Sequence, residues 1–401
     1  MKMKKMVAML LMMVMCVSLL GVATAESAEK VTLTVGYWGS SGEDKAFAKA
    51  IEGIMEQFPE VGEVKLQQYP GVADFYQRLP GEIAAGTAPD IVNITNEQHL
   101  QLIDQGLVIA LDDFNLDMSA LSESSVNVWN YDGKQYGIPT TAAPATFAVN
   151  VDLWTAADLG EYPTTWEEVY EASKVLTKDD VVGVCLDIGN IFHPTQYMNS
   201  FGGGWNGGTT INSKENVDAL TFIFKMFEEG LATTAKDAGK SWDGEVFAAG
   251  QSAMSTGGTW YVGTMSASAP DTNYTFIPMP GGDGNNGATL HSYAYAVLTG
   301  TKNEELAAKV ALYMARPEYQ VANAEITGGR PSDPSVMETF LELNPELAVL
   351  NDYEATATGF NYPSDLQFQT DFTSALEGVI YGGDTTTPQE ILDALFEAYG
   401  N

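Results

Sequence analysis

Stretches with a two-residue apolar repeat alternate with stretches of helical spacing, and this alternation constrains the fold more than any other feature of the chain. Residues 31–37 alternate apolar with small or polar side chains, as a strand with one buried face does. Apolar residues then recur at helical spacing from Phe47 to Phe58, and Pro59 is expected to end that helix. A strand is then expected over residues 64–69, a second helix over residues 74–85 that ends at Gly86, and another strand over residues 90–94. The pattern predicts an α/β fold rather than a β-sandwich.

Two later helices are marked by capping boxes. Thr165 with Glu168, and Thr387 with Glu390, have the spacing in which a hydroxyl and a carboxylate each accept a hydrogen bond from the other residue's backbone amide. We therefore expect helices to begin directly after both threonines.

The N-terminus has the pattern of a targeting segment. Three lysines among the first five residues precede an uncharged run over residues 6–25 that ends in Ala-Thr-Ala. We expect residues 1–25 to be a signal peptide that is cleaved before Glu26, and the protein to be exported to the periplasm or the extracellular side. Two alternatives stay open. An uncleaved membrane anchor is one, since about 20 apolar residues span a bilayer. A lipid anchor on Cys16 is the other, although Met15 stands where lipoprotein signals carry a small residue.

Length and charge narrow the class of protein. The 376 residues that follow the expected leader are enough for about two domains. Without the three leader lysines, 16 Lys and Arg face 53 acidic residues, a net charge of −37. Such a chain repels nucleic acid, because phosphate binding needs clustered basic residues. The acids are scattered, which fits a secreted surface; an acidic site for a cationic ligand is the alternative.

The sequence contains no recognisable catalytic or metal-binding spacing, so we expect no catalytic residues, metal or cofactor. The three histidines, His99, His193 and His291, lie far apart, and the cysteine outside the leader, Cys185, sits in an apolar run where we expect it to be buried. The G-x-G-x-x-G match at 202–207 lacks a convincing preceding strand and is interpreted as a loop. Residues 283–286 are interpreted as a glycine-rich turn rather than a calcium loop.

Residues 131–139, 149–154 and 163–168 resemble the central signature of family 1 extracellular solute-binding proteins, the sugar receptors of bacterial ABC importers. Further stretches are similar to the family in the same order along the chain. They are residues 86–90, 247–254 with 258–260, 276–282, 302–307 and 386–390. Gln251 and Thr259 depart from the lysine and the proline that the family usually carries.

The resemblance implies a two-lobed periplasmic-binding-protein type II fold with discontinuous lobes joined by hinge strands. Lobe one is expected to comprise residues 26–143 plus 290–335, and lobe two residues 144–289 plus 336–401. It also implies a monomer, not an enzyme, that captures a mono- or oligosaccharide in the interlobe cleft and delivers it to the permease subunits of an ABC importer. Three alternatives stay open: another solute, such as a polyamine, an iron chelate or a phosphonate; a sensor without a transport role; and an enzyme such as a glycosidase or lyase, for which no acid–base pair is recognisable.

Sugars present apolar faces to aromatic rings and hydroxyls to carboxylates and amides. Ligand-binding candidates therefore follow predicted strands or, like Trp260, align with a family position. They are Trp38, Ser40, Asn93, Glu97, Phe192, His193, Trp260 and Arg330.

Several candidates have a competing structural interpretation. Trp38 fits a packed core, Glu97 an exposed acid at a helix start, and His193 a turn beside Pro194. Arg330 fits either a uronic-acid carboxylate or a surface acid, and the second interpretation is favoured. Among the other tryptophans, Trp129 and Trp166 are expected in the core, Trp205 and Trp242 are left open, and Asp90 is expected to be structural.

Overall fold

The computed structural model describes residues 30–39, 41–281, 288–350, 357, 359–363, 365 and 367–401. The expected signal peptide, the candidate Ser40 and the predicted turn at 283–286 lie outside these residues. Among the described residues, no helix combines the length and the apolar character that crossing a bilayer requires.

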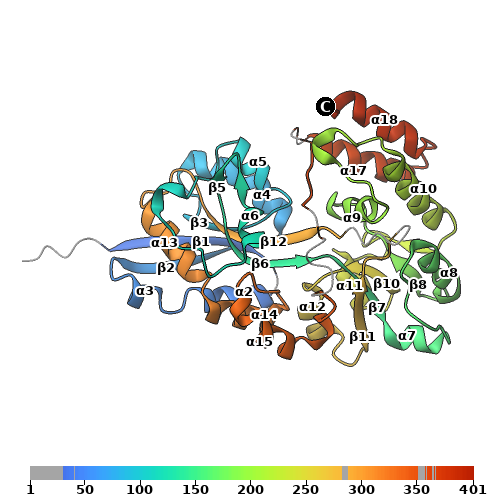
Figure 1. Cartoon of the computed structure of the whole chain (residues 1–401), viewed down its shortest axis with the longest axis horizontal. Coiled ribbons are helices and arrows are strands. Elements are labelled where there is room, and N and C mark those ends of the chain that lie inside the picture. Colours follow the sequence, from blue (N-terminus) through green and yellow to red (C-terminus); the bar gives the residue numbers. More distant parts are fainter. Residues whose placement is uncertain are drawn as a thin grey trace, which may run out of the picture.

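The first lobe is built on a five-stranded mixed sheet of order β2-β1-β3-β12-β6 (Figure 1). The first three of these strands run parallel, whereas β12 pairs antiparallel with both β3 and β6. The strands are β1 (Val31–Trp38), β2 (Val61–Tyr69), β3 (Ile91–Thr95), β6 (Ile138–Pro144) and β12 (Leu290–Val297).

The second lobe is built on another mixed sheet, of order β11-β7-β10-β8-β9. Here β8, β9 and β10 run parallel, and β7 is antiparallel to β10 and β11. The strands are β7 (Thr146–Asn150), β8 (Val182–Cys185), β9 (Ala232–Thr233), β10 (Ser252–Gly257) and β11 (Tyr274–Pro278); a separate hairpin pairs β4 (Asn130–Tyr131) with β5 (Lys134–Gln135).

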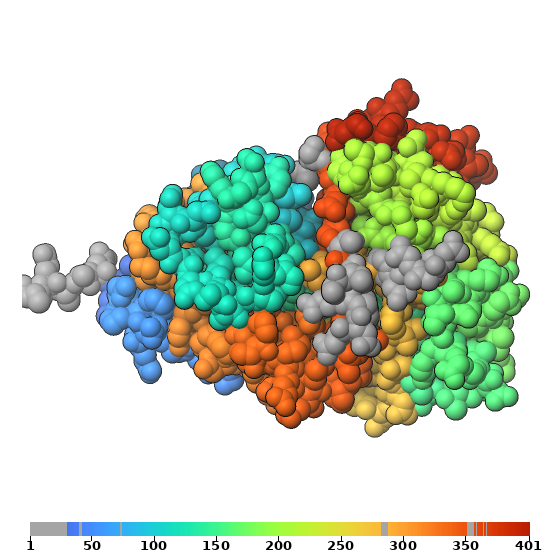
Figure 2. Space-filling model, viewed as in Figure 1, coloured from blue at the N-terminus to red at the C-terminus, as the bar shows by residue number. Residues whose placement is uncertain are grey.

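Helices cover both sheets, and α17 and α18 at the C-terminal end lie on the second lobe (Figures 1 and 2). The helices are α2 (Ser41–Ala50), α3 (Ile54–Gln57), α4 (Val72–Ala85), α5 (His99–Asp104), α6 (Glu123–Asn127), α7 (Val151–Ala156), α8 (Trp166–Leu176), α9 (Phe192–Ser200), α10 (Lys214–Glu228), α11 (Asp243–Ala248), α12 (Tyr261–Ser268), α13 (Glu304–Met314), α14 (Pro317–Thr327), α15 (Met337–Leu343), α17 (Gln367–Ile380) and α18 (Pro388–Tyr399).

The strand directions place the carboxyl edges of both sheets at the junction between the lobes. Because β6 runs parallel to β3, its last residue, Pro144, lies at the edge where β1 and β3 end, and β7 begins two residues later. Thr146 at the start of β7 pairs with Gly257 at the end of β10. The carboxyl edges of the parallel strands in both lobes therefore face the junction, where open α/β sheets usually bind ligands.

The predicted elements are largely confirmed, with one exception in the first helix. The predicted helix that ends at Pro59 is broken into α2 and α3 because Gly53 adopts a left-handed φ of 80°. Gly86, with a φ of 69°, ends α4 as expected. Both capping boxes are present, at Thr165 and Thr387.

The buried side chains bear out most of the structural interpretations. Trp129 and Trp166 are fully buried, and their indole N–H groups donate to Ser292 and Ser200 at 2.8 and 2.7 Å. Cys185 is buried too, which raises the pKa of its thiol well above the ordinary value. Asp90 accepts a hydrogen bond from the Thr34 amide at 2.8 Å. The 202–207 stretch lies in the connection between α9 and α10, in which Asn206–Gly208 forms a short 3-10 helix.

The Thr387 cap predicts a measurable loss of stability. Thr387→Ala leaves an amide at the start of α18 without its acceptor, so the free energy of unfolding should fall by about 1 kcal/mol. Urea denaturation followed by circular dichroism measures this change. Thr387→Ser keeps the oxygen and should stay close to wild type; equal losses in the two variants would contradict the capping role.

His99 predicts a pH-dependent stability. Burial lowers the pKa of His99 from 6.5 to about 4, while its Nδ1 lies 2.8 Å from the carbonyl oxygen of Asn96. The pKa of His99 is lower in the folded state than in the unfolded state. The stability gained by keeping this imidazole neutral is therefore fully present above pH 6.5 and is lost as the pH falls toward 4. Between pH 7 and 5, protonation of this histidine in the unfolded state should lower the free energy of unfolding by about 2 kcal/mol. His99→Gln should remove that part of the slope; identical slopes in denaturant titrations of both proteins would refute the assignment.

Candidate functional site

A cavity of ≈ 140 Å³ lies where the facing sheet edges meet. Its aromatic lining consists of Trp38, Phe47, Tyr293 and Tyr319 from the first lobe and Trp260 from the second. Polar groups come from several other elements and include Asn93, Thr140, Thr141, Thr259, His291 and Asn323. Glu43 from α2 lines the cavity as well, so aromatic faces and neutral hydrogen-bonding groups are combined with one carboxylate.

The first lobe supplies two of the sequence-predicted candidates to this cavity. Trp38 is the last residue of β1 and is half-buried, with its ring centroid 4.8 Å from that of Phe75 and 6.5 Å from that of Tyr293. Asn93 lies in the middle of β3 and is buried. Trp38 thus packs on the core with one face while the residue still lines the cavity.

Glu97 follows β3 and pairs with His291 near the start of β12. Glu97 Oε1 lies 3.2 Å from His291 Nδ1, and the side chain of Glu97 is 15% exposed. Burial lowers the pKa of His291, and the neighbouring Glu97 carboxylate partly offsets that effect. The other ring nitrogen of His291 is buried without a hydrogen-bond partner among the described residues.

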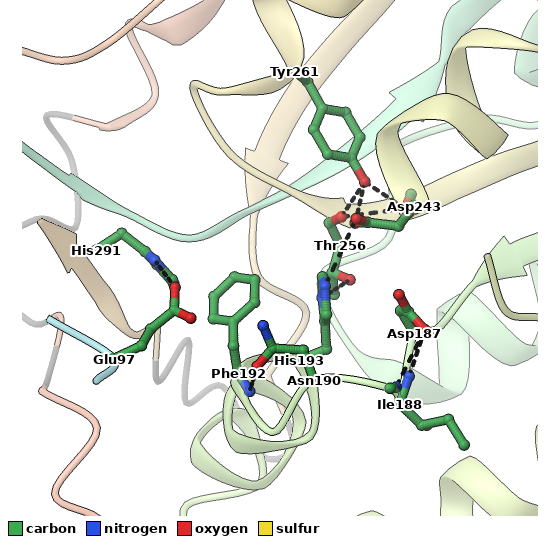
Figure 3. Close-up of polar contacts among 12 residues, drawn as sticks. Glu97, Asp187, Ile188, Asn190, Phe192, His193, Asp243, Thr256, Tyr261 and His291 are labelled. Atoms are coloured by element: carbon green, nitrogen blue, oxygen red, sulfur yellow. Dashed lines mark hydrogen bonds and ion pairs between the residues drawn. The ribbon is translucent and has the colours of Figure 1, made fainter. Parts of the chain in front are cut away.

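Phe192 separates this pair from a second polar cluster (Figure 3). Its ring centroid lies 4.0 Å from that of His291 and 4.4 Å from that of His193. Trp260 and Phe360 surround the same position, with centroids 5.7 and 6.1 Å from that of Phe192. These rings form an aromatic wall, defined here as Phe192, Trp260, His291 and Phe360.

The second polar cluster contains His193 and Asp243. His193 Nδ1 lies 3.3 Å from Thr256 Oγ1, and its Nε2 lies 3.7 Å from Asp243 Oδ1. Asp243 also accepts a hydrogen bond from the hydroxyl of Tyr261. Burial raises the pKa of Asp243, and the nearby imidazole of His193 opposes that shift.

His193 faces a groove of ≈ 800 Å³ on the far side of the aromatic wall from the cavity. Gln98 from the first lobe and Trp242 and Tyr381 from the second line this groove. Trp242, left open by the sequence, is therefore a groove residue, whereas Trp205 is buried against Phe368.

Arg330 is not among the described lining residues of either hollow, although its neighbour Gly329 lines the cavity. It is 5% exposed, and its Nη1 donates to the Ala142 carbonyl in β6 at 2.9 Å. The backbone carbonyl of Arg330 also accepts from the Ala142 amide at 3.1 Å. The side chain is buried at the hinge strand, so the surface location in the favoured interpretation is wrong.

The structure thus brings six sequence candidates to the junction. Trp38, Asn93 and Trp260 line the cavity, Phe192 belongs to the aromatic wall, and His193 lines the groove. Glu97 contacts the wall through His291 and is not among the described lining residues of either hollow. The structure adds residues that the sequence did not single out, namely Tyr293, His291, Asn323 and Phe360. Tyr293 and His291 alternate along β12, so a period-two reading of that strand would have indicated them.

Comparisons with known proteins agree with this architecture. The chain is 25% identical to the galactooligosaccharide-binding protein of Bacillus subtilis over 375 residues, which cover 88% of this chain and 87% of that protein. It is 26% identical over 313 residues to the diacetylchitobiose binding protein DasA of Streptomyces coelicolor, covering 75% and 73%.

Solved structures show the same fold. The ABC substrate-binding protein Lmo0181 of Listeria monocytogenes, in complex with cycloalternan, superposes with a TM-score of 0.83 at 21% identity, covering 92% of this chain and 98% of that one. The GacH receptor of Streptomyces glaucescens superposes with a TM-score of 0.81 at 21% identity, with the same coverage. These likenesses establish the two-lobed fold.

The family model described as "Bacterial extracellular solute-binding protein" matches residues 45–349, three quarters of the chain. This range holds every strand of the two sheets except β1, which ends at the cavity residue Trp38 and lies N-terminal to the matched range. The chain belongs to the family of bacterial extracellular solute-binding proteins.

Proposed function

We propose that this protein captures a carbohydrate, a mono- or oligosaccharide, in the cavity between its lobes. The observation that carries the proposal is the lining of the cavity, where Trp38, Trp260 and Tyr293 lie beside amides, hydroxyls and the carboxylate of Glu43. Aromatic rings suit the C–H faces of a sugar, and amides such as that of Asn93 suit its hydroxyls. The names of the relatives, which bind oligosaccharides, support the same ligand class.

Micromolar binding requires about −8 kcal/mol. Stacking on one or two rings and several hydrogen bonds of about 1 kcal/mol net each contribute toward that value. Ligand pockets usually have volumes of about 300–1,000 Å³. A cavity of ≈ 140 Å³ holds part of such a ligand, so entry requires the lobes to move apart.

The proposed lobe boundaries follow the strands that cross the junction. We assign residues 26–143 and 290–335 to lobe one and residues 144–289 and 336–401 to lobe two. Membership of β6 and β12 in the first sheet, and of β7 and β11 in the second, supports this division. The packing of Phe340 and Leu347 into the core of the second lobe supports it too. Closure about the crossing strands would give a membrane partner two states to distinguish.

The same proposal includes export and delivery. The protein would lose residues 1–25, act as a monomer in the periplasm or outside the cell, and deliver its ligand to the permease subunits of an ABC importer rather than transform it. The family assignment supports this role. A sensor that passes closure to a membrane kinase would bind the same ligand in the same way.

Carbohydrate binding predicts a thermal shift. The melting temperature should rise with one class of mono- or oligosaccharide, because a ligand that binds the native state stabilises it by mass action. Trp260→Ala removes a ring of the cavity and should weaken binding about tenfold or more, as calorimetry with that sugar would measure.

Trp242→Ala is the matched control, since it removes the same kind of ring from the groove instead of the cavity. A loss of binding in Trp242→Ala but not in Trp260→Ala would place the ligand in the groove. Shifts only with polyamines or other non-sugar solutes would refute the ligand class.

Glu97 predicts a second effect on affinity. In the proposal its carboxylate accepts a sugar hydroxyl while remaining near His291, and hydrogen bonds to charged groups contribute about 1.5–3 kcal/mol. Glu97→Gln should therefore weaken carbohydrate binding by about tenfold or more, measured by calorimetry, with little change in melting temperature of the free protein. Unchanged affinity would remove Glu97 from the contact set.

A further inference from the structure

Three metal-ligating side chains converge at the groove, outside the cavity. Asp187 follows β8, His193 is the second residue of α9, and Asp243 is the first residue of α11. One possible ligand atom of each lies within 4.8 Å of the other two. The three come from separate parts of the chain, and the fold of the second lobe brings them together (Figure 3).

His193 is oriented as a ligand rather than as a saturated core residue. The side chain is 6% exposed, and its Nδ1 is held by Thr256 at 3.3 Å. Nε2 is directed at Asp243 from 3.7 Å, beyond hydrogen-bond distance, and forms no hydrogen bond among the described residues. Metal-ligating histidines commonly have one ring nitrogen fixed by a neighbour in this way while the other is left for the ion.

Each carboxylate has one oxygen anchored and one left over. Asp243 Oδ2 accepts from Tyr261, whereas Oδ1 faces His193. Asp187 Oδ1 accepts from the amides of Ile188 and Gly189 at 2.9 and 3.3 Å, and its Oδ2 has no hydrogen bond among the described residues. Asp243 is 2% exposed and pairs with no Lys or Arg in the described part of the chain. A carboxyl group buried in this way is either protonated or compensated by a positive partner, and a bound metal ion would supply that partner.

We propose that Asp187, His193 and Asp243 bind a divalent transition-metal ion, with Zn²⁺ the best fit to one imidazole and two carboxylates. Zinc bonds of about 2.0–2.2 Å place neighbouring ligand atoms about 3.3 Å apart, so the side chains would draw together on binding. Three protein ligands leave one tetrahedral position open toward the groove.

The surroundings permit access of an ion. The groove of ≈ 800 Å³ leads to His193 and Asp187. Two lysines also line the groove. The charge of Lys236 is compensated by Glu377, whose Oε1 lies 3.6 Å from Lys236 Nζ. Lys240 is the other positive group at the groove.

This site goes beyond the proposed carbohydrate function, because all three ligands lie in the second lobe and Phe192 stands between them and the Glu97–His291 pair. An ion bound there would fix the first turn of α9, which carries Phe192 into the aromatic wall.

The test is a titration of the chelator-treated protein with Zn²⁺ by calorimetry, without any carbohydrate. We expect one ion per chain, and affinity at least about tenfold weaker in Asp187→Asn and in His193→Gln. Asp113→Asn is the matched control: Asp113 is an exposed acid on the 3-10 helix Asp112–Phe114, and its loss should leave Zn²⁺ affinity unchanged. Co²⁺ should give a visible absorption band that His193→Gln alters.

Absence of saturable Zn²⁺ and Co²⁺ uptake by the unsubstituted protein would overturn the proposal. Stoichiometric uptake that survives both Asp187→Asn and His193→Gln would overturn it as well. Asp187 is only partly buried, so its variant keeps the test decisive if substitutions at Asp243 fail to fold. Carbohydrate binding measured in chelator-containing buffer separates failure of the metal site from failure of the carbohydrate proposal.

Discussion

The antiparallel pair of β6 and β12 is the connection on which both lobes depend. Pro144 at the end of β6 pairs with Leu290 at the start of β12, and the Ala145 amide then donates to the Thr289 carbonyl at 2.8 Å. The next residue, Thr146, already belongs to the second sheet. Buried backbone groups must be paired, so the crossing is tolerated only because these two chain segments satisfy each other.

A third segment completes the crossing. Pro331 forms a bridge with Thr141, and the Ser332 hydroxyl donates to the Pro139 carbonyl at 2.8 Å. Arg330 donates from its side chain to Ala142. The buried guanidinium therefore contacts the backbone of the hinge strand.

How far the sequence reveals this structure depends on whether the signal is local. Strand periodicity and capping boxes are local, so β1, β3, α8 and α18 were predicted within one or two residues at the start of each element. The break between α2 and α3 was missed because it depends on a left-handed Gly53 inside an otherwise helical apolar pattern. A glycine in such a pattern is tolerated in a helix as well, so residue type alone does not mark the break.

Whether a residue of the site could be predicted also depends on whether its sequence signal is local. Trp38 and Asn93 were predictable because they lie on strands whose direction the α/β pattern implies. The convergence of Asp187, His193 and Asp243 was not predictable, because their spacing of 6 and 50 residues matches no motif and only tertiary folding brings them within 4.8 Å. The outcome for Arg330 likewise depends on Ala142, a partner 188 residues away.

Phe192 and His193 link the two hollows through adjacent residues in one helical turn. Phe192 packs on His291 and Trp260, which line the cavity, while His193 faces the groove and Asp243. A displacement of the first turn of α9 therefore changes both environments together, because the interior is close-packed and α9 is buried along its whole length. An occupant of the groove that favours one position of this turn must change the affinity of the cavity for its ligand. By linkage, the cavity ligand must change the affinity of the groove for its occupant by the same factor.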